Sequence, residues 1–105
     1  MIKVADAHPD KYLDMPKGLS GYWWETDNQI CIPLVENQNE GDGTFSKWLT
    51  ELEAKGKLIF FPTIVSARLD AILRTRGYQD AFVIDKEMGF VDGLALPANR
   101  QAVMV

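Results

Sequence analysis

A glycine-bearing loop is the part of this sequence whose residue types and spacing most suggest chemistry. It reads Gln38-Asn39-Glu40-Gly41-Asp42-Gly43-Thr44 and lies between a short apolar run and a stretch with helical periodicity. Glycines let a backbone approach a ligand closely, and the free N–H groups at a helix start favour an anion. The loop therefore predicts a phosphate or pyrophosphate site, although the same glycines also suit a purely structural turn.

The residues that usually carry metal, triad or thiol chemistry are scarce. The single histidine, His8, is followed by Pro9 in a polar stretch and has no companion at metal-ligand spacing. We therefore predict a loop residue and no metal site. The single cysteine, Cys31, lies in the apolar run Ile30-Cys31-Ile32, which favours a small buried side chain over a nucleophile. One cysteine cannot form an internal disulfide, so no oxidising compartment is implied.

Hydrophobic periodicity predicts the elements that must position this loop. In chain order we expect a hairpin over 21–36, a helix over 44–55, a strand over 57–61, a helix opened by Pro62 and Thr63 with Val65, Leu69, Ile72 and Leu73 on its core side, and strands over 81–85 and 90–96. A helix that links two strands normally makes them parallel. The expected fold is α/β of the α+β kind, with a mixed, mostly antiparallel sheet in one domain over 1–105.

The two ends of the chain are the parts that the sequence defines least. A short strand at 2–5 and one or two helical turns over 10–15 both fit residues 1–20. The tail over 97–105 is expected to be loose or paired at a sheet edge. Within the hairpin, Pro33 cannot donate a ladder hydrogen bond, which predicts an edge, a bulge or a place where neighbouring strands part.

Together with its flanking elements, the loop resembles the cofactor-binding part of the GNAT family of acetyl-CoA-dependent N-acetyltransferases. It matches the pattern Gln/Arg-x-x-Gly-x-Gly/Ala, and a helix, a strand and a second helix closed by Gly77-Tyr78 follow it. The resemblance covers about residues 21–96 and is strongest over 30–78. It implies a central β-α-β-α crossover, a strand that bulges and splays from its neighbour, and acetyl-CoA as cofactor.

The resemblance also implies roles for individual residues. The pyrophosphate and the pantetheine arm would be held by Leu34, Val35, Gln38, Gly41, Asp42, Gly43, Thr44 and Ser66. Glu36 would act as the general base that deprotonates the acceptor amine, with Glu25 and Asp27 as the next candidates. Each has a plainer alternative: Asp42 and Ser66 as helix-start residues, and the three carboxylates as solvated side chains.

Three departures from the family pattern keep a second function open. Some twenty residues precede Gly21 where the family has a longer acceptor wall, Glu40 and Asp42 make the loop acidic, and Leu73 stands where many members carry a tyrosine acid. The alternative is a GNAT-like domain without turnover that binds a protein, of the kind frequent in phage and mobile elements. Whether the chain is an enzyme is left open at this point.

The charge balance and the apolar content of the sequence limit the classes of partner that the protein is expected to bind. Fifteen acidic against eleven basic residues give a net charge of −4, which argues against non-specific nucleic-acid binding. There is no apolar stretch near the ~20 residues that a membrane span needs, and the first residues lack the apolar core of a signal peptide. We expect a cytoplasmic protein that acts on a small-molecule or protein amine, and a homodimer is compatible with the sequence.

Overall fold

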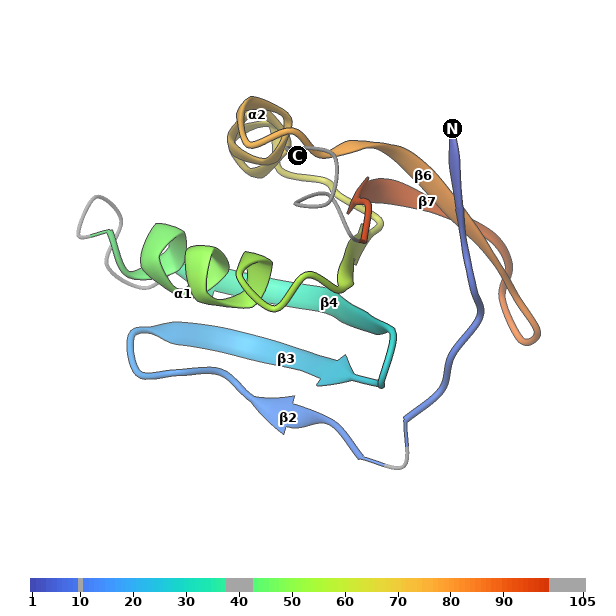
Figure 1. Cartoon of the computed structure of the whole chain (residues 1–105), viewed down its shortest axis with the longest axis horizontal. Coiled ribbons are helices and arrows are strands. Elements are labelled where there is room, and N and C mark those ends of the chain that lie inside the picture. Colours follow the sequence, from blue (N-terminus) through green and yellow to red (C-terminus); the bar gives the residue numbers. More distant parts are fainter. Residues whose placement is uncertain (10, 38–42, 99–105) are drawn as a thin grey trace.

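The computed structural model describes residues 1–9, 11–37 and 43–98. Within that part of the chain, seven strands and two helices follow one another as drawn in Figure 1. Their bounds are β1 Ile2–Val4, β2 Leu13–Asp14, β3 Leu19–Glu25, β4 Gln29–Asn37, α1 Thr44–Glu53, β5 Leu58–Pro62, α2 Ala67–Thr75, β6 Gln79–Asp85 and β7 Gly89–Leu96.

The seven strands form one sheet in the order β1-β6-β7-β5-β4-β3-β2. The pairs β1–β6 and β4–β5 are parallel, and the other four neighbouring pairs are antiparallel. The prediction of a mixed, mostly antiparallel sheet is thus confirmed. The parallel strands β4 and β5 are consecutive in the sheet, and α1 lies between them in the chain.

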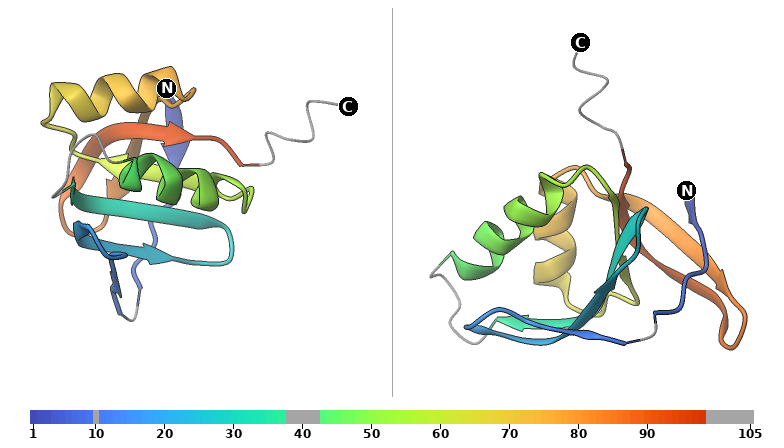
Figure 2. Two further views of the ribbon diagram at one scale, coloured as in Figure 1. Left: turned by 90° about the vertical axis from the view of Figure 1, so that its left-hand side faces the viewer. Right: turned by 60° about the horizontal axis from the view of Figure 1, so that its bottom comes forward.

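Both helices lie on the same face of the sheet, as the two views of Figure 2 show. The periodicity predicted for α1 is confirmed, because its four apolar positions are buried against β4 and β5. The main core on this side contains Leu19, Ile30, Ile32, Phe45, Trp48, Leu49, Leu52, Ile59, Phe61, Leu73, Tyr78, Leu94 and Leu96. Burial of these side chains supplies most of the free energy that holds the helices on the sheet.

The other face carries a smaller apolar cluster made by Val4, Cys31, Phe60, Ala81, Val83 and Ala95. No helix residue belongs to it; instead the segment that joins β1 to β2 crosses from one edge of the sheet to the other. The Gln29 side chain anchors that segment by donating from Nε2 to the Ala5 carbonyl over 3.0 Å. The N-terminal residues therefore form one wall of this face.

Two expectations for local structure are wrong. A helical turn over 10–15 is contradicted by β2, whose Leu13 and Asp14 pair with Trp23 and Tyr22 across the sheet edge. A tertiary contact to the aromatic residues of β3 decides the conformation there, and the local pattern could not show it.

The start of the second helix was also wrongly predicted. Pro62 ends β5, and Thr63 takes a left-handed conformation (φ 52°) while its N–H donates to the Asp92 carbonyl over 2.7 Å. The chain follows β7 at this point and enters α2 only at Ser66, whose hydroxyl accepts the Leu69 N–H. Val65, expected in the core, is 93% exposed for that reason.

Polar networks fix the ends of the helices. Arg76 donates to both carboxylate oxygens of Glu53 over 2.7 and 3.0 Å, and the Tyr78 hydroxyl donates to the same carboxylate. Two cations, Lys55 and Lys57, hold Glu25 at the end of β3. The carboxyl ends of α1 and α2 are thereby tied to each other and to the sheet, while their amino ends converge at the site described next.

Candidate functional site

The centre of the sheet contains a place where two neighbouring strands part. The parallel strands β4 and β5 pair only through Gln29–Leu58, Ile30–Ile59 and Cys31–Phe60, although β4 continues to Asn37 and β5 to Pro62. Carrying the same register two residues further sets Pro33 opposite Pro62. Neither proline can donate a ladder hydrogen bond, which gives a physical reason for the pairing to stop there.

A bulge in β4 accompanies this parting. Between the pairs Tyr22–Leu34 and Trp24–Cys31, β3 advances by two residues and β4 by three. Ile32 belongs to the helix-side core and Val35 packs against the same core, so the alternation of faces shifts by one residue between them. The prediction made from Pro33, a bulge or a place where strands part, is confirmed in both respects.

Two glycines let each parted strand approach its outer neighbour closely. A Cβ on Gly21 of β3 would lie 2.0 Å from the Leu34 carbonyl oxygen of β4, and one on Gly93 of β7 would lie 2.0 Å from the Phe61 carbonyl oxygen of β5. No side chain fits at such distances. The glycines therefore allow β4 to lean towards β3 and β5 to lean towards β7.

A pocket of about 580 Å³ opens on the helix side of the parted strands. The end of β4 and the amino ends of α1 and α2 surround it. Its walls are made by Val35, Glu36, Asn37, Gly43, Phe45, Ser46, Ser66, Arg68, Leu69 and Ile72. Because three elements converge here only through the tertiary fold, the pocket is a product of the strand parting and of the one-sided helix packing.

The pocket brings together four of the residues predicted for cofactor binding or catalysis: Val35, Glu36, Gly43 and Ser66. Thr44 is the first residue of α1, directly after Gly43. Leu34 is 46% exposed and pairs with Tyr22, which lines a different pocket on the opposite face. The remaining predicted residues, Gln38, Gly41 and Asp42, lie outside the described residues.

The amino end of α1 offers backbone donors to this pocket. Gly43 caps the helix in a left-handed conformation (φ 80°), without a side-chain hydrogen bond and with no acidic residue in the first turn. The first N–H groups of a helix have no partner within the helix and carry a partial positive charge. This end of the pocket favours an anionic group.

The amino end of α2 adds a second polar edge and an apolar wall. Ser66 caps this helix, and Arg68 in its first turn is the one basic residue among those lining the pocket. Leu69 and Ile72 of the same helix face Phe45 and Val35 across it. Arg68 is exposed, and it borders the pocket because it lies in the first turn of α2. The periodicity of the sequence gave it no role at a site; its place two residues after the Ser66 cap was the available signal.

No tyrosine among the described residues lines this pocket. Leu73, at the position where the resemblance would place an acid, is fully buried in the core. Tyr78 is buried too, and its hydroxyl bonds to Glu53. Glu36 is the only carboxylate lining the pocket among the described residues, and its side chain is exposed at the end of β4.

A second pocket, of about 340 Å³, lies on the face without helices. Aromatic side chains from two segments meet at it: the ring of Tyr12 is 5.0 Å from that of Tyr22 and 5.5 Å from that of Trp24. Cys31 lies at its floor and is buried, as expected; burial raises the pKa of its thiol to about 12. The thiol is therefore protonated and unreactive at neutral pH.

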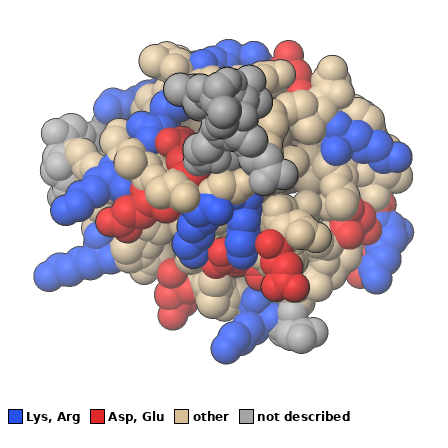
Figure 3. Space-filling model, in the orientation of Figure 1, with Lys and Arg blue, Asp and Glu red and all other residues tan. Residues whose placement is uncertain are grey.

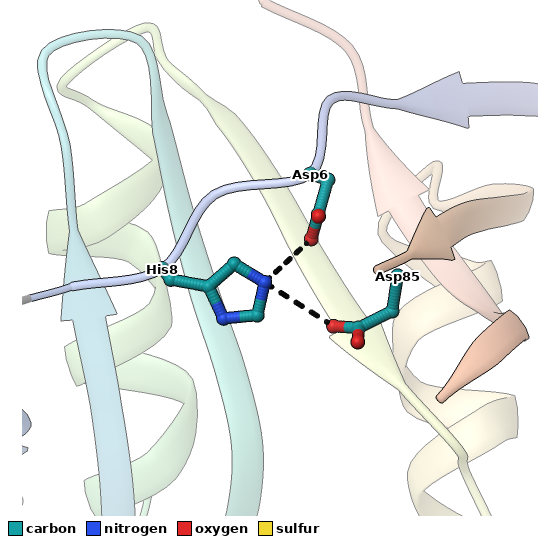
Figure 4. A group of neighbouring side chains, drawn as sticks. All are labelled: Asp6, His8 and Asp85. Atoms are coloured by element: carbon teal, nitrogen blue, oxygen red, sulfur yellow. Dashed lines mark ion pairs between the residues drawn. The ribbon is translucent and has the colours of Figure 1, made fainter. Parts of the chain in front are cut away.

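His8 lies at this second pocket beside two carboxylates (Figure 4). Its Nε2 is 3.0 Å from Asp6 Oδ1 and 3.5 Å from Asp85 Oδ2. The spacing of residues in the sequence showed no ligand partner for His8, because Asp85 comes 77 residues later in the chain. The parallel pairing of β1 with β6 brings the two residues together. Backbone N–H bonds from Met88 and Glu87 hold the pKa of Asp85 below its ordinary value.

The charges on the surface are mixed. On the face drawn in Figure 3, basic and acidic side chains alternate and do not gather into one basic area. Several of them form ion pairs, such as Arg74 with Asp70 and Asp80. A surface without one large basic area agrees with the net charge of −4 of the sequence.

Comparisons of the chain with models of protein families, with curated proteins and with solved structures gave no match. Among the described residues, neither helix has the length or apolar character needed to cross a membrane.

Proposed function

We propose that this chain is a GNAT-like domain that binds acetyl-CoA and transfers its acetyl group to an amine. The observation that carries the proposal is the conjunction of a bulged β4, its early parting from the parallel strand β5, and a pocket at the amino end of the helix between them. In the resemblance drawn from the sequence, these three features together form the coenzyme A site.

The pocket supplies groups suited to each part of this ligand. The amino end of α1 after Gly43 would bind the pyrophosphate, with Arg68 as a nearby cation. Beyond Cys31, β4 has no β5 partner, so its backbone can bond to the amides of the pantetheine arm. Val35, Leu69 and Ile72 would contact the apolar parts of the arm.

In the proposed reaction the amine nitrogen attacks the thioester carbonyl, and the coenzyme A thiolate leaves. Glu36, the carboxylate at the pocket, is the residue we assign to removing the amine proton, directly or through a water. Among the described residues that line the pocket, none supplies an evident acid for the thiolate, so the thiolate would take its proton from solvent.

One observation favours the second function, a protein-binding domain without turnover. Three large apolar side chains on the β6–β7 hairpin are exposed: Ile84 by 50%, Met88 by 77% and Phe90 by 60%. Exposed apolar side chains that gather on one hairpin are typical of a protein contact. This second function depends on a protein contact at the hairpin and does not require that coenzyme A be released.

A titration with acetyl-CoA tests the proposal, with binding measured by calorimetry and by the shift in thermal unfolding. A ligand at 100 times its dissociation constant should stabilise the fold by about 2.7 kcal/mol. Gly43→Glu places a carboxylate at the amino end of α1, where a Cβ meets nothing within 4 Å, and should abolish binding. Gly89→Glu is the matched control, because its φ of 78° and its open surroundings equal those of Gly43 at the far hairpin.

The outcomes separate the two functions. Binding that is lost in Gly43→Glu and kept in Gly89→Glu, together with release of free coenzyme A in the presence of amines, supports the transferase. Binding without release across a panel of amines supports the domain without turnover. No binding at millimolar acetyl-CoA refutes the transferase and leaves the protein-binding domain.

A further inference from the structure

Asp6, His8 and Asp85 form a compact group of potential metal ligands on the face without helices (Figure 4). Each offers one ligand atom, and these atoms all lie within 4.8 Å of one another. Asp6 and His8 come from the segment after β1, and Asp85 is the last residue of β6. The parallel pairing of β1 with β6 sets the two segments side by side.

Backbone groups orient both carboxylates. Asp85 Oδ1 accepts N–H bonds from Glu87 and Met88 over 2.7 and 2.9 Å, which leaves Oδ2 directed at the imidazole. Asp6 Oδ2 accepts the Lys86 N–H over 3.3 Å, which leaves Oδ1 directed at the imidazole. Such hydrogen bonds from outside the ligand set fix the direction of metal-binding carboxylates.

The separations fit one small ion. Metal–ligand bonds to nitrogen and oxygen are about 2.0–2.1 Å long. With ligand–metal–ligand angles between about 90° and about 109°, neighbouring ligand atoms lie about 2.9–3.4 Å apart. Of the two distances from His8 Nε2, the 3.0 Å to Asp6 Oδ1 lies within this range, and the 3.5 Å to Asp85 Oδ2 exceeds its upper limit slightly. Two carboxylates and a neutral imidazole carry a charge of −2, which one divalent cation neutralises.

We propose that Asp6, His8 and Asp85 bind a divalent transition-metal ion, with Zn²⁺ the best suited to one nitrogen and two oxygen ligands. Three protein ligands leave at least one position of the ion open. The three residues line the second pocket, so a small oxygen-bearing ligand or a water can occupy that position. The proposal is independent of the acetyl-CoA site, which lies on the other face of the sheet.

One buried polar group belongs to a residue that lines the same pocket. Trp24 lines it, and its indole N–H is buried without a hydrogen-bond partner among the described residues. A buried donor without a partner costs about 1–3 kcal/mol, so native structures seldom leave one unmatched.

The chain has one histidine, which makes its imidazole a unique probe. Full-length protein without an affinity tag is titrated with ZnCl₂ while the imidazole resonances are followed by NMR. We expect a single set of resonances to shift, saturating at one Zn²⁺ per chain. Co²⁺ should give visible absorption bands of a low-coordinate site and should compete with Zn²⁺.

His8→Lys separates a metal site from a purely structural ion pair, because lysine keeps the cation between the two carboxylates but does not take the place of a neutral imidazole ligand. It should weaken Zn²⁺ binding by at least about 100-fold while thermal stability without metal is retained. Asp85→Asn keeps the acceptor for the Glu87 and Met88 N–H groups and should also weaken binding. Asp92→Asn, an exposed aspartate on β7, is the control and should bind as the wild type does.

Two results would overturn the proposal. One is an imidazole spectrum that does not respond to millimolar Zn²⁺. The other is a His8→Lys variant that binds Zn²⁺ as tightly as the wild type, which would place the ion elsewhere.

Discussion

Replacing Gly21 by alanine should destabilise the fold by about 3–5 kcal/mol. The added Cβ would lie 2.0 Å from the Leu34 carbonyl oxygen, whereas real Cβ contacts essentially never fall below 3.0 Å. The strands β3 and β4 would have to separate by about 1 Å at a place where backbone, and not a flexible side chain, is in the way. In addition, φ at Gly21 is 127°, a conformation that costs an alanine roughly 1–2 kcal/mol.

Two matched variants divide this effect into its causes. Gly89→Ala has a positive φ of 78° and nothing within 4 Å of the new Cβ, so it measures backbone strain alone, about 1 kcal/mol. Gly93→Ala has no positive φ, but its Cβ would lie 2.0 Å from the Phe61 carbonyl oxygen, so it measures the steric conflict alone. The cost of Gly21→Ala should exceed that of Gly89→Ala by at least about 2 kcal/mol.

Urea unfolding followed by tryptophan fluorescence gives these differences, and thermal unfolding checks them. For a domain of this size 1 kcal/mol shifts Tm by at least about 4 °C, so Gly21→Ala should lower Tm by roughly 12 °C or more. A Gly21→Ala variant no less stable than Gly89→Ala would refute the close approach of β3 to β4. It would also remove the reason given for the leaning of β4 away from β5.

Three further predictions concern single side chains. Cys31 should resist alkylation at neutral pH in the folded protein and react on unfolding, because burial raises its pKa to about 12; rapid labelling of native protein would contradict this. Burial raises the pKa of Glu25, but hydrogen bonds from Lys57 and Lys55 outweigh it, and the pKa lies below its ordinary 4.5. A carboxyl whose pKa is lower in the folded than in the unfolded protein stabilises the fold at pH values above its unfolded pKa. Glu25→Gln should therefore lower the free energy of unfolding by about 1 kcal/mol at neutral pH, and this difference should disappear as the pH falls below 4.5. Urea unfolding at several pH values measures it, and a difference that persists in acid would contradict the prediction. Tyr78→Phe removes the hydroxyl that donates to Glu53, while Arg76 keeps that carboxylate paired. The free energy of unfolding should therefore fall by only about 1 kcal/mol, as measured by thermal unfolding. A much larger fall would indicate a further role for the hydroxyl.

The sequence predicted those parts of the fold that local patterns determine. The four apolar positions of α1 recur at helical spacing and are all buried, and β4 and β5 read as apolar runs. Pro33 signalled the disturbed ladder because a missing N–H is a property of the residue itself. The resemblance to the GNAT family, and not the local pattern, implied that Val35, Glu36, Gly43 and Ser66 share one site, and these four residues line one pocket in the structure.

What the sequence could not predict depends on contacts between distant residues. Pro62 was interpreted as a helix opener, because its place at the end of β5, where the β4–β5 pairing has stopped, depends on the register of distant strands. His8 was interpreted as isolated, because the β1–β6 pairing that brings Asp85 to it spans most of the chain. Arg68 received no role at a site, since periodicity does not tell which end of a helix borders a pocket.

The short parallel ladder between β4 and β5 has a consequence for how the sheet exchanges its amide hydrogens. The sheet consists of two blocks, β2-β3-β4 and β5-β7-β6-β1, and among the described residues three parallel pairs form the only ladder between them. The ladder between the blocks is shorter than those of β3 with β4 and of β6 with β7, so the helix-side core, which contains residues of both blocks, must supply much of what holds them together. Slow hydrogen exchange should therefore divide the protein along that line, with each block protected as a unit and the amides beside this ladder exchanging together whenever the blocks separate.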